Sequence, residues 1–312
     1  MENIKNVSNK FKIKKISGGS TEDIFFNQFD VTWFNVNGST SHYPRVLTKL
    51  PIEQSIDDGT VTYSYNNDLF RSDDFKADHG EKRHILFAGC SQTEGVGSPL
   101  DTIWPKMIYE KLASNNDLSG FFNIARSGYG WQKIISTFMV YVEKYGFPEY
   151  LFVLMPNLGR FFEWDSSGES WVYVQRYPTG INATDDERDA REIPYSVFNE
   201  KPLTVSEHRR SFIDFIAQWK LFEQYCETNG VKLLWASWDY NENENYLLAN
   251  QSKNYIPMAP NELFEYIAKN RPDGKMNKHD IKRRDGHDGV LIHEFWESKF
   301  FAEIGKRGWL NV

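Results

Sequence analysis

The fold of this chain is decided by the stretch His84-Ile-Leu-Phe-Ala-Gly-Cys-Ser-Gln-Thr-Glu-Gly-Val-Gly97. It begins as a short, continuous apolar run, which is typical of a strand buried on both faces of a parallel sheet. A glycine-rich turn follows and carries Ser91 at the end of the expected strand. Because ligand sites of parallel sheets lie at the carboxyl ends of the strands, this turn is a candidate for function.

Three further apolar runs have the same character. They cover residues 121–125, 150–155 and 231–237, and helical patterns lie between the runs at 103–112, 132–145 and 210–228. Strands that alternate with helices predict βαβ units and right-handed crossovers. We therefore expect a three-layer α/β/α sandwich around a parallel sheet.

Two segments depart from this rhythm. Residues 1–80 contain alternating apolar and polar positions with Asn-Gly and Asp-Asp-Gly turn signals, which predict a β-rich N-terminal extension. Residues 81–312 then form the main domain. Within it, residues 158–205 are charged, aromatic-rich and punctuated by glycine and proline, so we expect an insertion near the mouth of the site.

Composition excludes several classes of partner. The formal net charge of -7 and a sequence pI of about 5.6 give no basic footprint for nucleic acid. No run approaches the roughly 18 apolar residues of a membrane span, and the N-terminus lacks the apolar core of a signal peptide. Cys90 and Cys226 stand in unrelated segments, so no disulfide is expected. The sequence predicts a cytoplasmic or virion-associated protein, with no nucleic-acid or membrane partner and an undetermined oligomeric state.

Polar groups follow three successive predicted strands. Ser91 follows the first, Gly128 the second and Asn157 the third. A serine hydroxyl needs a base to become a nucleophile, and the tetrahedral intermediate that it forms needs hydrogen-bond donors. The backbone N–H of Gly128 and the amide of Asn157 are candidate donors. Each residue alone is more often a structural cap or turn residue than a catalytic one, so the argument depends on their joint order.

A base is available near the C-terminus. The block Arg284-Asp-Gly-His-Asp-Gly289 precedes an apolar helical segment and offers an imidazole between carboxylates. We favour His287 as the base because it lies in the turn, with His293 as the alternative. Asp285 is the preferred orienting carboxylate, and Asp288 is its substitute.

These four blocks, in this order, resemble the SGNH (GDSL-like) hydrolases over about residues 84–310, with Cys90 in the place of the family's aspartate. The resemblance implies a five-stranded flavodoxin-like sheet, Ser91 as nucleophile, and an oxyanion hole of the Ser91 N–H, the Gly128 N–H and the Asn157 amide. The family's last block is usually Asp-x-x-His, whereas one residue separates Asp285 from His287 here. The stretch 67–75 also resembles one that often precedes the serine block in GDSL-like proteins of bacteria and phages.

The expected reaction is hydrolysis of an acyl ester, an O-acetylated glycan being the favoured substrate. Four aromatic residues of the insertion are candidates for substrate binding: Phe161, Phe162, Trp164 and Trp171. Two rivals stay open, a non-catalytic glycan-binding or virion-type structural protein with the same fold, and an acyltransferase.

No cofactor or metal is expected. The serine turn matches neither the P-loop nor the dinucleotide fingerprint, and no second cluster has metal-ligand spacing. Cys90 could be proposed as a thiolate nucleophile, but a neighbour of Ser91 on an extended turn directs its side chain away from the site.

Overall fold

The computed structural model of this chain describes residues 11–12, 32–33, 52–56, 59–156, 160–165, 170–175, 205–238, 242–259, 261–270 and 289–311. The helices in these ranges are α1 (Ser91–Glu94), η2 (Leu100–Thr102), α2 (Trp104–Ala113), α3 (Trp131–Tyr145), α5 (Val205–Thr228), α6 (Glu242–Gln251), α7 (Glu262–Asn270) and α9 (Val290–Arg307). The strands are β1 (Phe11–Lys12), β2 (Thr32–Trp33), β3 (Ile52–Ile56), β4 (Gly59–Tyr63), β5 (Ile85–Gly89), β6 (Phe122–Asn123), β7 (Tyr150–Met155), β8 (Arg160–Asp165), β9 (Ser170–Gln175) and β10 (Lys232–Ser237).

The four predicted core strands form one sheet. Its order is β10-β7-β5-β6, and each neighbouring pair is parallel. Every residue of β5 and β7 is buried, which explains why their sequences are continuous apolar runs rather than alternating ones. The predicted parallel sheet is confirmed, although β6 has only two paired residues.

A single bridge occupies a fifth position at the outer edge of β10. Trp235 pairs in parallel with Tyr255: its N–H donates to the carbonyl of Asn254 at 3.0 Å, and its carbonyl accepts from Ile256 at 2.8 Å. Counted along the chain, the spatial order from β6 is therefore 2-1-3-4-5. This is the flavodoxin-like order of doubly wound sheets.

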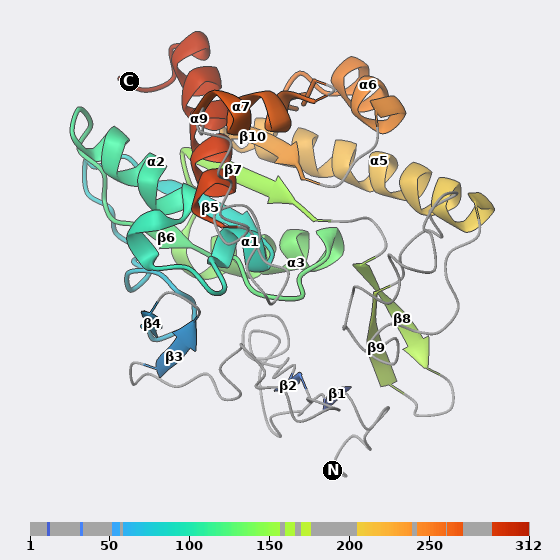
Figure 1. The fold of residues 1–312 in the computed structure, drawn as a ribbon, viewed down its shortest axis with the longest axis horizontal. Helices are drawn as coiled ribbons and strands as arrows, with labels where there is room; N and C mark the ends of the chain where they lie inside the picture. Colours follow the sequence, from blue (N-terminus) through green and yellow to red (C-terminus); the bar gives the residue numbers. More distant parts are fainter. Residues whose placement is uncertain are drawn as a thin grey trace.

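Helices cover both faces of the sheet (Figure 1). Leu86 and Ala88 of β5 belong to a hydrophobic cluster with α3 and α5, whereas Ile85 and Phe87 belong to a second cluster with α2, α7 and α9. Successive residues of a strand face opposite sides, so one strand feeds both clusters. The architecture is a three-layer α/β/α sandwich.

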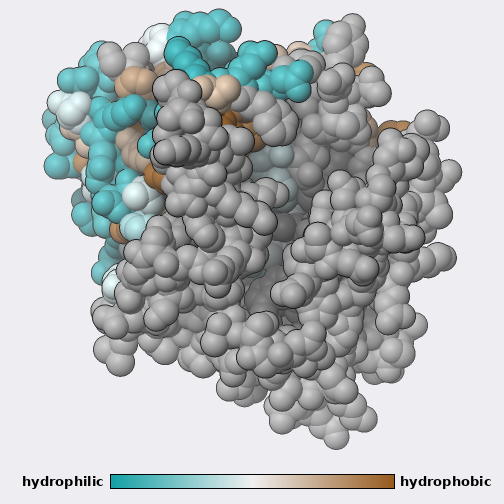
Figure 2. All heavy atoms as spheres, viewed as in Figure 1, coloured by the Kyte–Doolittle hydropathy of each residue, from teal (hydrophilic) through white to brown (hydrophobic). Residues whose placement is uncertain are grey.

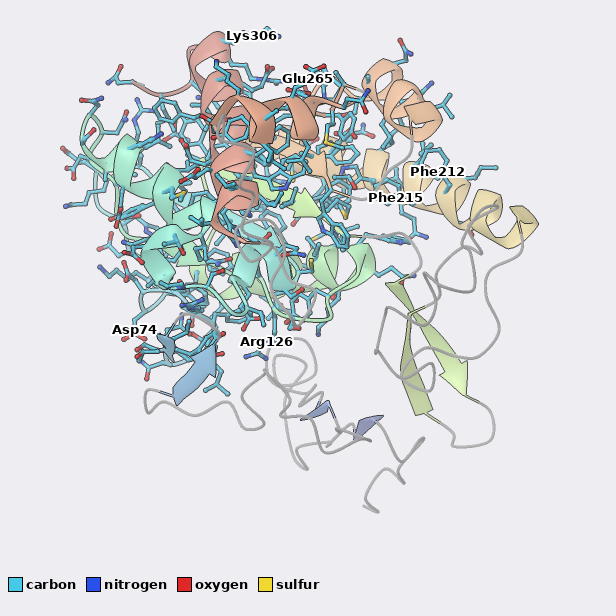
Figure 3. The ribbon with its side chains drawn as sticks, in the orientation of Figure 1. Asp74, Arg126, Phe212, Phe215, Glu265 and Lys306 are labelled. Atoms are coloured by element: carbon cyan, nitrogen blue, oxygen red, sulfur yellow. The ribbon has the colours of Figure 1, made fainter. Side chains whose placement is uncertain are left out.

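Each helical layer is built on aromatic packing. Phe212 and Phe215 project from the first half of α5 (Figure 3), and Phe215 stacks near Trp219 with ring centroids 5.8 Å apart. On the other face, Trp104 of α2 stacks on Phe300 of α9 at 4.7 Å. The helical periodicity predicted for 210–228 is confirmed, and the helix begins earlier than expected, at Val205.

The outer surface of the second layer is hydrophilic. On the face shown in Figure 2, hydrophilic residues gather over α2, where Glu110 and Lys111 are exposed. No helix in the described ranges is both long enough and apolar enough to span a membrane.

Antiparallel pairs occur outside the central sheet. In the N-terminal part, β1 pairs with β2, and β3 pairs with β4, as the alternating pattern predicts. In the segment expected to be an irregular insertion, β8 and β9 form a six-residue antiparallel ladder. The proposed division at residue 80 stays a prediction, but Phe70 and Phe75 pack in the cluster that contains β5 and α3.

Candidate active site

Ser91 lies at the carboxyl end of the central strand. β5 ends at Gly89, Cys90 is the N-cap, and Ser91 is the first residue of α1. The strand order of the sheet reverses between β5 and β7, and ligands of open α/β sheets bind beyond the strand ends at this point. Cys90 is fully buried in the cluster with α3 and α5, an environment that does not suit a nucleophilic thiolate.

The glycine before the serine turn is required by close packing. A Cβ built on Gly89 would lie 2.1 Å from Oγ1 of Thr93 and 2.9 Å from the carbonyl oxygen of Leu154 on β7. The first turn of α1 therefore folds back onto the end of β5 and against the neighbouring strand. This is the local reason for the Gly-x-Ser-x-Thr pattern: Thr93 occupies the space that a side chain at Gly89 would need.

A buried arginine holds the loop that leaves α1. Gly95 ends the helix with a φ of 78°, in the left-handed region that favours glycine. The Arg71 guanidinium, 1% exposed, donates to the carbonyls of Gly95 at 2.7 Å, Glu94 at 3.3 Å and Ser98 at 2.9 Å. One planar donor group thus fixes three backbone carbonyls just after the serine helix.

Gly128 lies in a tight turn beyond β6. The N–H of Tyr129 donates to the carbonyl of Arg126 at 3.1 Å, and Gly128 has a φ of 81°. Ser127 is not among the described residues with positive φ, so the combination is that of a type II turn with glycine at its third position. A Cβ at Gly128 would meet nothing within 4 Å among the residues that the structure describes.

Two hydrogen bonds join this turn to the serine helix. The N–H of Ser127 donates to the Glu94 carboxylate at 2.6 Å. Asn123, on β6, donates from its side-chain amide to the carbonyl of Thr93 at 3.1 Å and accepts the N–H of Ala125 at 3.0 Å. The structure thus places the Ser91 and Gly128 segments next to each other. Within the described ranges, neither the Ser91 N–H nor the Gly128 N–H has an acceptor.

Two buried cations lie beside the turn. Arg126 is 5% exposed and its guanidinium lies 5.0 Å from the Phe70 ring (Figure 3). Lys133, in the first turns of α3, lies 5.7 Å from the Tyr129 ring. Burial and, to a smaller extent, the charge of Arg126 together lower the pKa of Lys133 to about 7. The turn therefore has groups of opposite charge close to it, the guanidinium of Arg126 and the carboxylate of Glu94.

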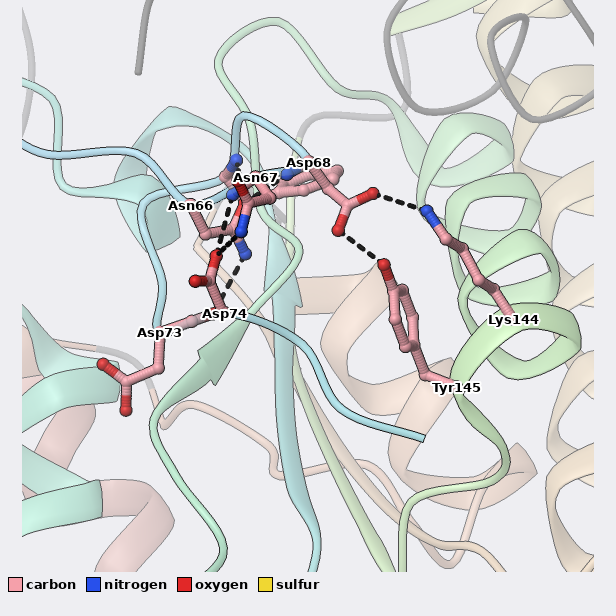
Figure 4. A network of polar contacts seen from close by, with 8 residues as sticks. Asn66, Asn67, Asp68, Asp73, Asp74, Lys144 and Tyr145 are labelled. Carbon is pink, nitrogen blue, oxygen red and sulfur yellow. Dashed lines mark hydrogen bonds and ion pairs between the residues drawn. The ribbon is translucent and has the colours of Figure 1, made fainter. Parts of the chain in front are cut away.

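The segment before β5 supports the site from the β6 side (Figure 4). Asn66 accepts the N–H groups of Asp68 and Phe70 through its side-chain oxygen, at 3.0 and 2.9 Å. The carboxylate of Asp68 accepts from Lys144 at 2.8 Å and from the Tyr145 hydroxyl at 2.6 Å. This network ties the segment to the end of α3.

The same segment also anchors the start of β6. Asp73 accepts the N–H of Phe121 at 2.9 Å. Ser72 accepts the N–H of Asn123 at 3.1 Å and donates to the carbonyl of Phe121. The stretch 67–75 thus forms hydrogen bonds with the residues around β6 at the edge of the sheet. It also places Arg71 beside the loop that follows α1.

Several predicted site residues lie outside the described residues. These are Asn157, Asp285, His287 and Asp288. β7, which precedes Asn157, ends at Met155 beside the end of β5, and α9, which follows His287, begins at Val290. Their assignments stay predictions.

The alternative base is described. His293 lies in the first turn of α9, is 1% exposed, and its Nδ1 accepts the N–H of Trp104 at 3.4 Å. This bond places the imidazole at the N-terminus of α2, in the core between two helices. An accepting Nδ1 requires the tautomer with its proton on Nε2.

The four aromatic candidates belong to the β8–β9 hairpin. Phe161, Phe162 and Trp164 lie in β8, and Trp171 lies in β9 directly opposite Trp164 in the register. The hairpin follows β7 and therefore leaves the sheet at the strand end next to Ser91. Their role in substrate binding stays a prediction.

Sequence reasoning missed the residues that hold the site together. Arg71 and Glu94 both make side-chain hydrogen bonds to backbone around the serine helix, yet neither carries a periodic or spacing signal. The available signal for Arg71 was its place in the stretch 67–75, which resembles a segment that precedes the serine block.

No protein-family model and no curated protein matches this chain in sequence. Solved structures that match this chain include one described as TesA, with 11% identity and a TM-score of 0.40 over 70% of this chain and 97% of the other. A psychrotrophic esterase, EstA from a Pseudoalteromonas species, has 11% identity and a TM-score of 0.38 over 71% and 96% of the two chains. A lipolytic G-D-S-L family protein from Veillonella parvula has 12% identity and a TM-score of 0.36 over 70% and 96%.

Proposed function

We propose that this chain is a serine esterase of the SGNH type, with Ser91 as its nucleophile. The observation that carries the proposal is the position of Ser91 at the reversal point of the sheet, next to a turn that leaves the Gly128 N–H without an acceptor in the described part of the chain. An unpaired backbone N–H costs free energy if it is buried, so a turn that leaves this N–H unused gains no stability from it. An oxyanion is the ligand that such a donor suits.

In the proposed reaction, the Ser91 hydroxyl attacks the ester carbonyl carbon while His287 takes its proton. The carbonyl oxygen becomes an oxyanion and accepts from the N–H groups of Ser91 and Gly128 and from the Asn157 amide. The alcohol leaves with the proton from His287, and water then hydrolyses the acyl-serine by the same steps. Asp285 orients the imidazole.

The proposed substrate class is an acyl ester on a polar carrier, with an O-acetylated glycan as the leading candidate. The aromatic residues of β8 and β9 would offer stacking surfaces for sugar rings. No metal or cofactor takes part in the proposed mechanism. Among the described residues, no group of three or more histidine, cysteine, aspartate or glutamate side chains is arranged to hold a metal ion.

The test compares p-nitrophenyl acetate hydrolysis by the wild type and by Ser91→Ala, His287→Ala and His293→Ala at matched folding. We expect Ser91→Ala and His287→Ala to lower kcat by at least about a thousandfold, as removal of triad residues does. We expect His293→Ala to act mainly on stability, because its ring packs in the core. Labelling by a fluorophosphonate provides a second readout, since it requires an activated serine.

Two outcomes would change the assignment. Loss of activity in His293→Ala but not in His287→Ala, with both variants folded, would make His293 the base. A folded wild type that neither hydrolyses the ester nor reacts with the fluorophosphonate would contradict the esterase and favour a non-catalytic binding or structural role for this fold.

A further inference from the structure

A connection, residues 76–82, leads from the segment that carries Arg71 towards strand β5, and one side chain attaches it to the sandwich. All its residues are exposed except His79. The His79 ring packs against the body of the protein, and both of its nitrogens are buried. A stretch with one packed side chain opens locally at a much lower cost than the whole protein unfolds.

The backbone of the connection adds little to this attachment. The N–H of Gly80 donates to the Asp78 carboxylate at 2.8 Å, and the N–H of Lys82 donates to the His79 carbonyl at 3.1 Å. Both bonds are internal to the connection. Lys82 also forms an ion pair with Asp117, but both side chains are exposed, where such pairs contribute little. Within the described ranges, the His79 ring is therefore the main contact between the connection and the sandwich.

The ring of His79 stacks on a second imidazole, that of His84 directly before β5. The two centroids are 3.7 Å apart, and the planes are 27° from parallel. Phe122 of β6 lies edge-on to both rings, and Nε2 of His84 lies 2.7 Å from the Tyr141 hydroxyl. Neither nitrogen of His79 nor Nδ1 of His84 has a hydrogen-bond partner among the described residues. The contact is thus one between aromatic faces, and most of its polar atoms gain nothing from it.

Such a stack suits neutral imidazoles only. Two imidazolium rings at this separation repel each other, and a buried charge without a hydrogen-bond partner is costly. Burial is the largest cause that lowers the pKa of both histidines from 6.5, and His79 also lowers that of His84. Both rings are therefore neutral in the packed state at pH 7, and acid favours any state in which they reach water.

The groups that face the pair do not cancel the effect of burial. From β6 the pair meets the apolar ring of Phe122. The hydroxyls of Tyr141 and Tyr145 on α3 carry no charge at neutral or acidic pH, since burial raises the pKa of both. The Lys76 ammonium opposes protonation of His79. The groups that favour protonation of the pair are the Asp78 carboxylate and the backbone carbonyls of Lys76, Tyr145 and Phe147.

We propose that His79 and His84 form an acid-sensitive switch: the neutral stack holds residues 76–82 on the sandwich, and protonation of the pair releases this connection while the sandwich stays folded. In the released state the His79 ring reaches water, and His84 loses the ring that covers it. The closed form has its full stability above about pH 6.5 and loses it as the pH falls. Each imidazole that titrates raises the population of the open form about thirtyfold between pH 7.5 and 5.

The test uses the full chain and needs no enzymatic activity. Hydrogen exchange of the residue-82 amide, corrected for its intrinsic pH dependence, reports the opening because this amide donates to the His79 carbonyl. NMR measures it from pH 7.5 to 5 in the wild type, in His79→Phe and in His79→Phe/His84→Phe. Phenylalanine can stack but cannot be protonated. Lys82→Met is the matched control, since it keeps both histidines and the amide and removes only the exposed ion pair.

We expect opening in the wild type to rise at least about thirtyfold from pH 7.5 to 5. The rise in His79→Phe should be at least about fivefold smaller, because only His84 can then titrate. The double variant should stay within about threefold over the whole range, and the control should follow the wild type. The amides of β7 should remain at least about a hundredfold better protected than residue 82 at pH 5, which shows that the sandwich is still folded.

A smaller rise in the wild type would overturn the inference, as would a rise in His79→Phe equal to that of the wild type. Loss of protection in β7 together with residue 82 would also overturn it, because protonation would then unfold the sandwich and not release the connection. If the double variant does not fold, the comparison of His79→Phe with the wild type decides.

Discussion

Gly89 shows how a single residue determines the geometry at the start of the site. The strand end and the first turn of α1 approach so closely that Thr93 fills the space of the missing side chain. The contact includes the backbone oxygen of Leu154, which cannot move without disturbing the sheet. The need for glycine here comes from packing across two strands, and not from an unusual φ.

Gly89→Ala should therefore destabilise the protein by about 2–3 kcal/mol, the range typical of overpacked cores. Gly80→Ala is the control, because its added Cβ would meet nothing within 4 Å among the described residues. Its only expected cost is that of placing alanine at a φ of 58°, about 1 kcal/mol. Urea unfolding of both variants gives the two free energies. Equal losses would show that the approach between Gly89 and Thr93 relaxes easily.

The segment from Asn66 to Asp73 acts as one element although it has no regular secondary structure. It bonds to the edge strand β6, to the end of α3 and, through Arg71, to the loop after α1. These contacts with three separate parts of the sandwich hold the loop after α1 in place.

Replacing Arg71 by lysine tests this role. A single ammonium group cannot follow the planar arrangement of guanidinium donors, so buried carbonyls of the loop would lose their hydrogen bonds. We expect Arg71→Lys to lower the free energy of unfolding by about 2–4 kcal/mol. Lys82→Met, which removes an exposed ion pair with Asp117, should cost less than about 1 kcal/mol. Chemical denaturation gives the free energy of unfolding of both variants. Equal losses in the two would contradict a role of Arg71 in holding the loop after α1.

The β8–β9 hairpin is the element expected to bind the carrier of the ester. Trp164→Ala and Trp171→Ala should each raise KM for an O-acetylated glycan by about five- to thirtyfold, since loss of an aromatic contact costs roughly 1–2 kcal/mol. Hydrolysis of p-nitrophenyl acetate should change little, because it has no sugar to stack. Steady-state kinetics on both substrates separate the two effects. Equal changes on both would place the tryptophans in the reaction and not in carrier recognition.

In the part of the chain that the structure describes, a pair of histidines lies at the opposite end of β5 from Ser91. His84 precedes the strand, is 5% exposed, stacks on His79 with ring centroids 3.7 Å apart, and its Nε2 lies 2.7 Å from the Tyr141 hydroxyl. Burial and, to a smaller extent, the neighbouring His79 together lower the pKa of His84 to about 3. Both imidazoles are therefore neutral in the folded protein at pH 7.

The sign of the pH effect follows from this depression. In the unfolded chain the pKa of His84 is about 6.5, so acid protonates the unfolded state first. Stability is fully present above pH 6.5 and is lost as pH falls from there towards 3, by about 1.4 kcal/mol per unit for this group. Urea unfolding between pH 7.5 and 5 should show this extra slope in the wild type and not in His84→Gln. Identical slopes would mean that His84 is solvated in the native state.

The sequence by itself determined the sandwich. Continuous apolar runs and helical periodicity are local properties of neighbouring residues, so they predicted the strands β5, β7 and β10, the helices between them, and the position of Ser91 after the first strand. The parallel order followed, because strands that alternate with helices have few alternatives. The antiparallel ladder of β8 and β9 was not predicted, because its mixture of charged and aromatic residues does not show the regular alternation of apolar and polar positions that indicates a strand.

Only the tertiary structure decided which residues support the serine. Arg71 and Glu94 act on backbone groups that lie 23 to 33 positions away in the chain, and Thr93 acts on Gly89 through space. A hydrogen bond to a backbone carbonyl or N–H can be made to any residue type, so it leaves no pattern at the distant position. The sequence therefore specifies the elements and the order of the reactive groups, whereas the packing of the folded chain selects the side chains that hold those groups in place.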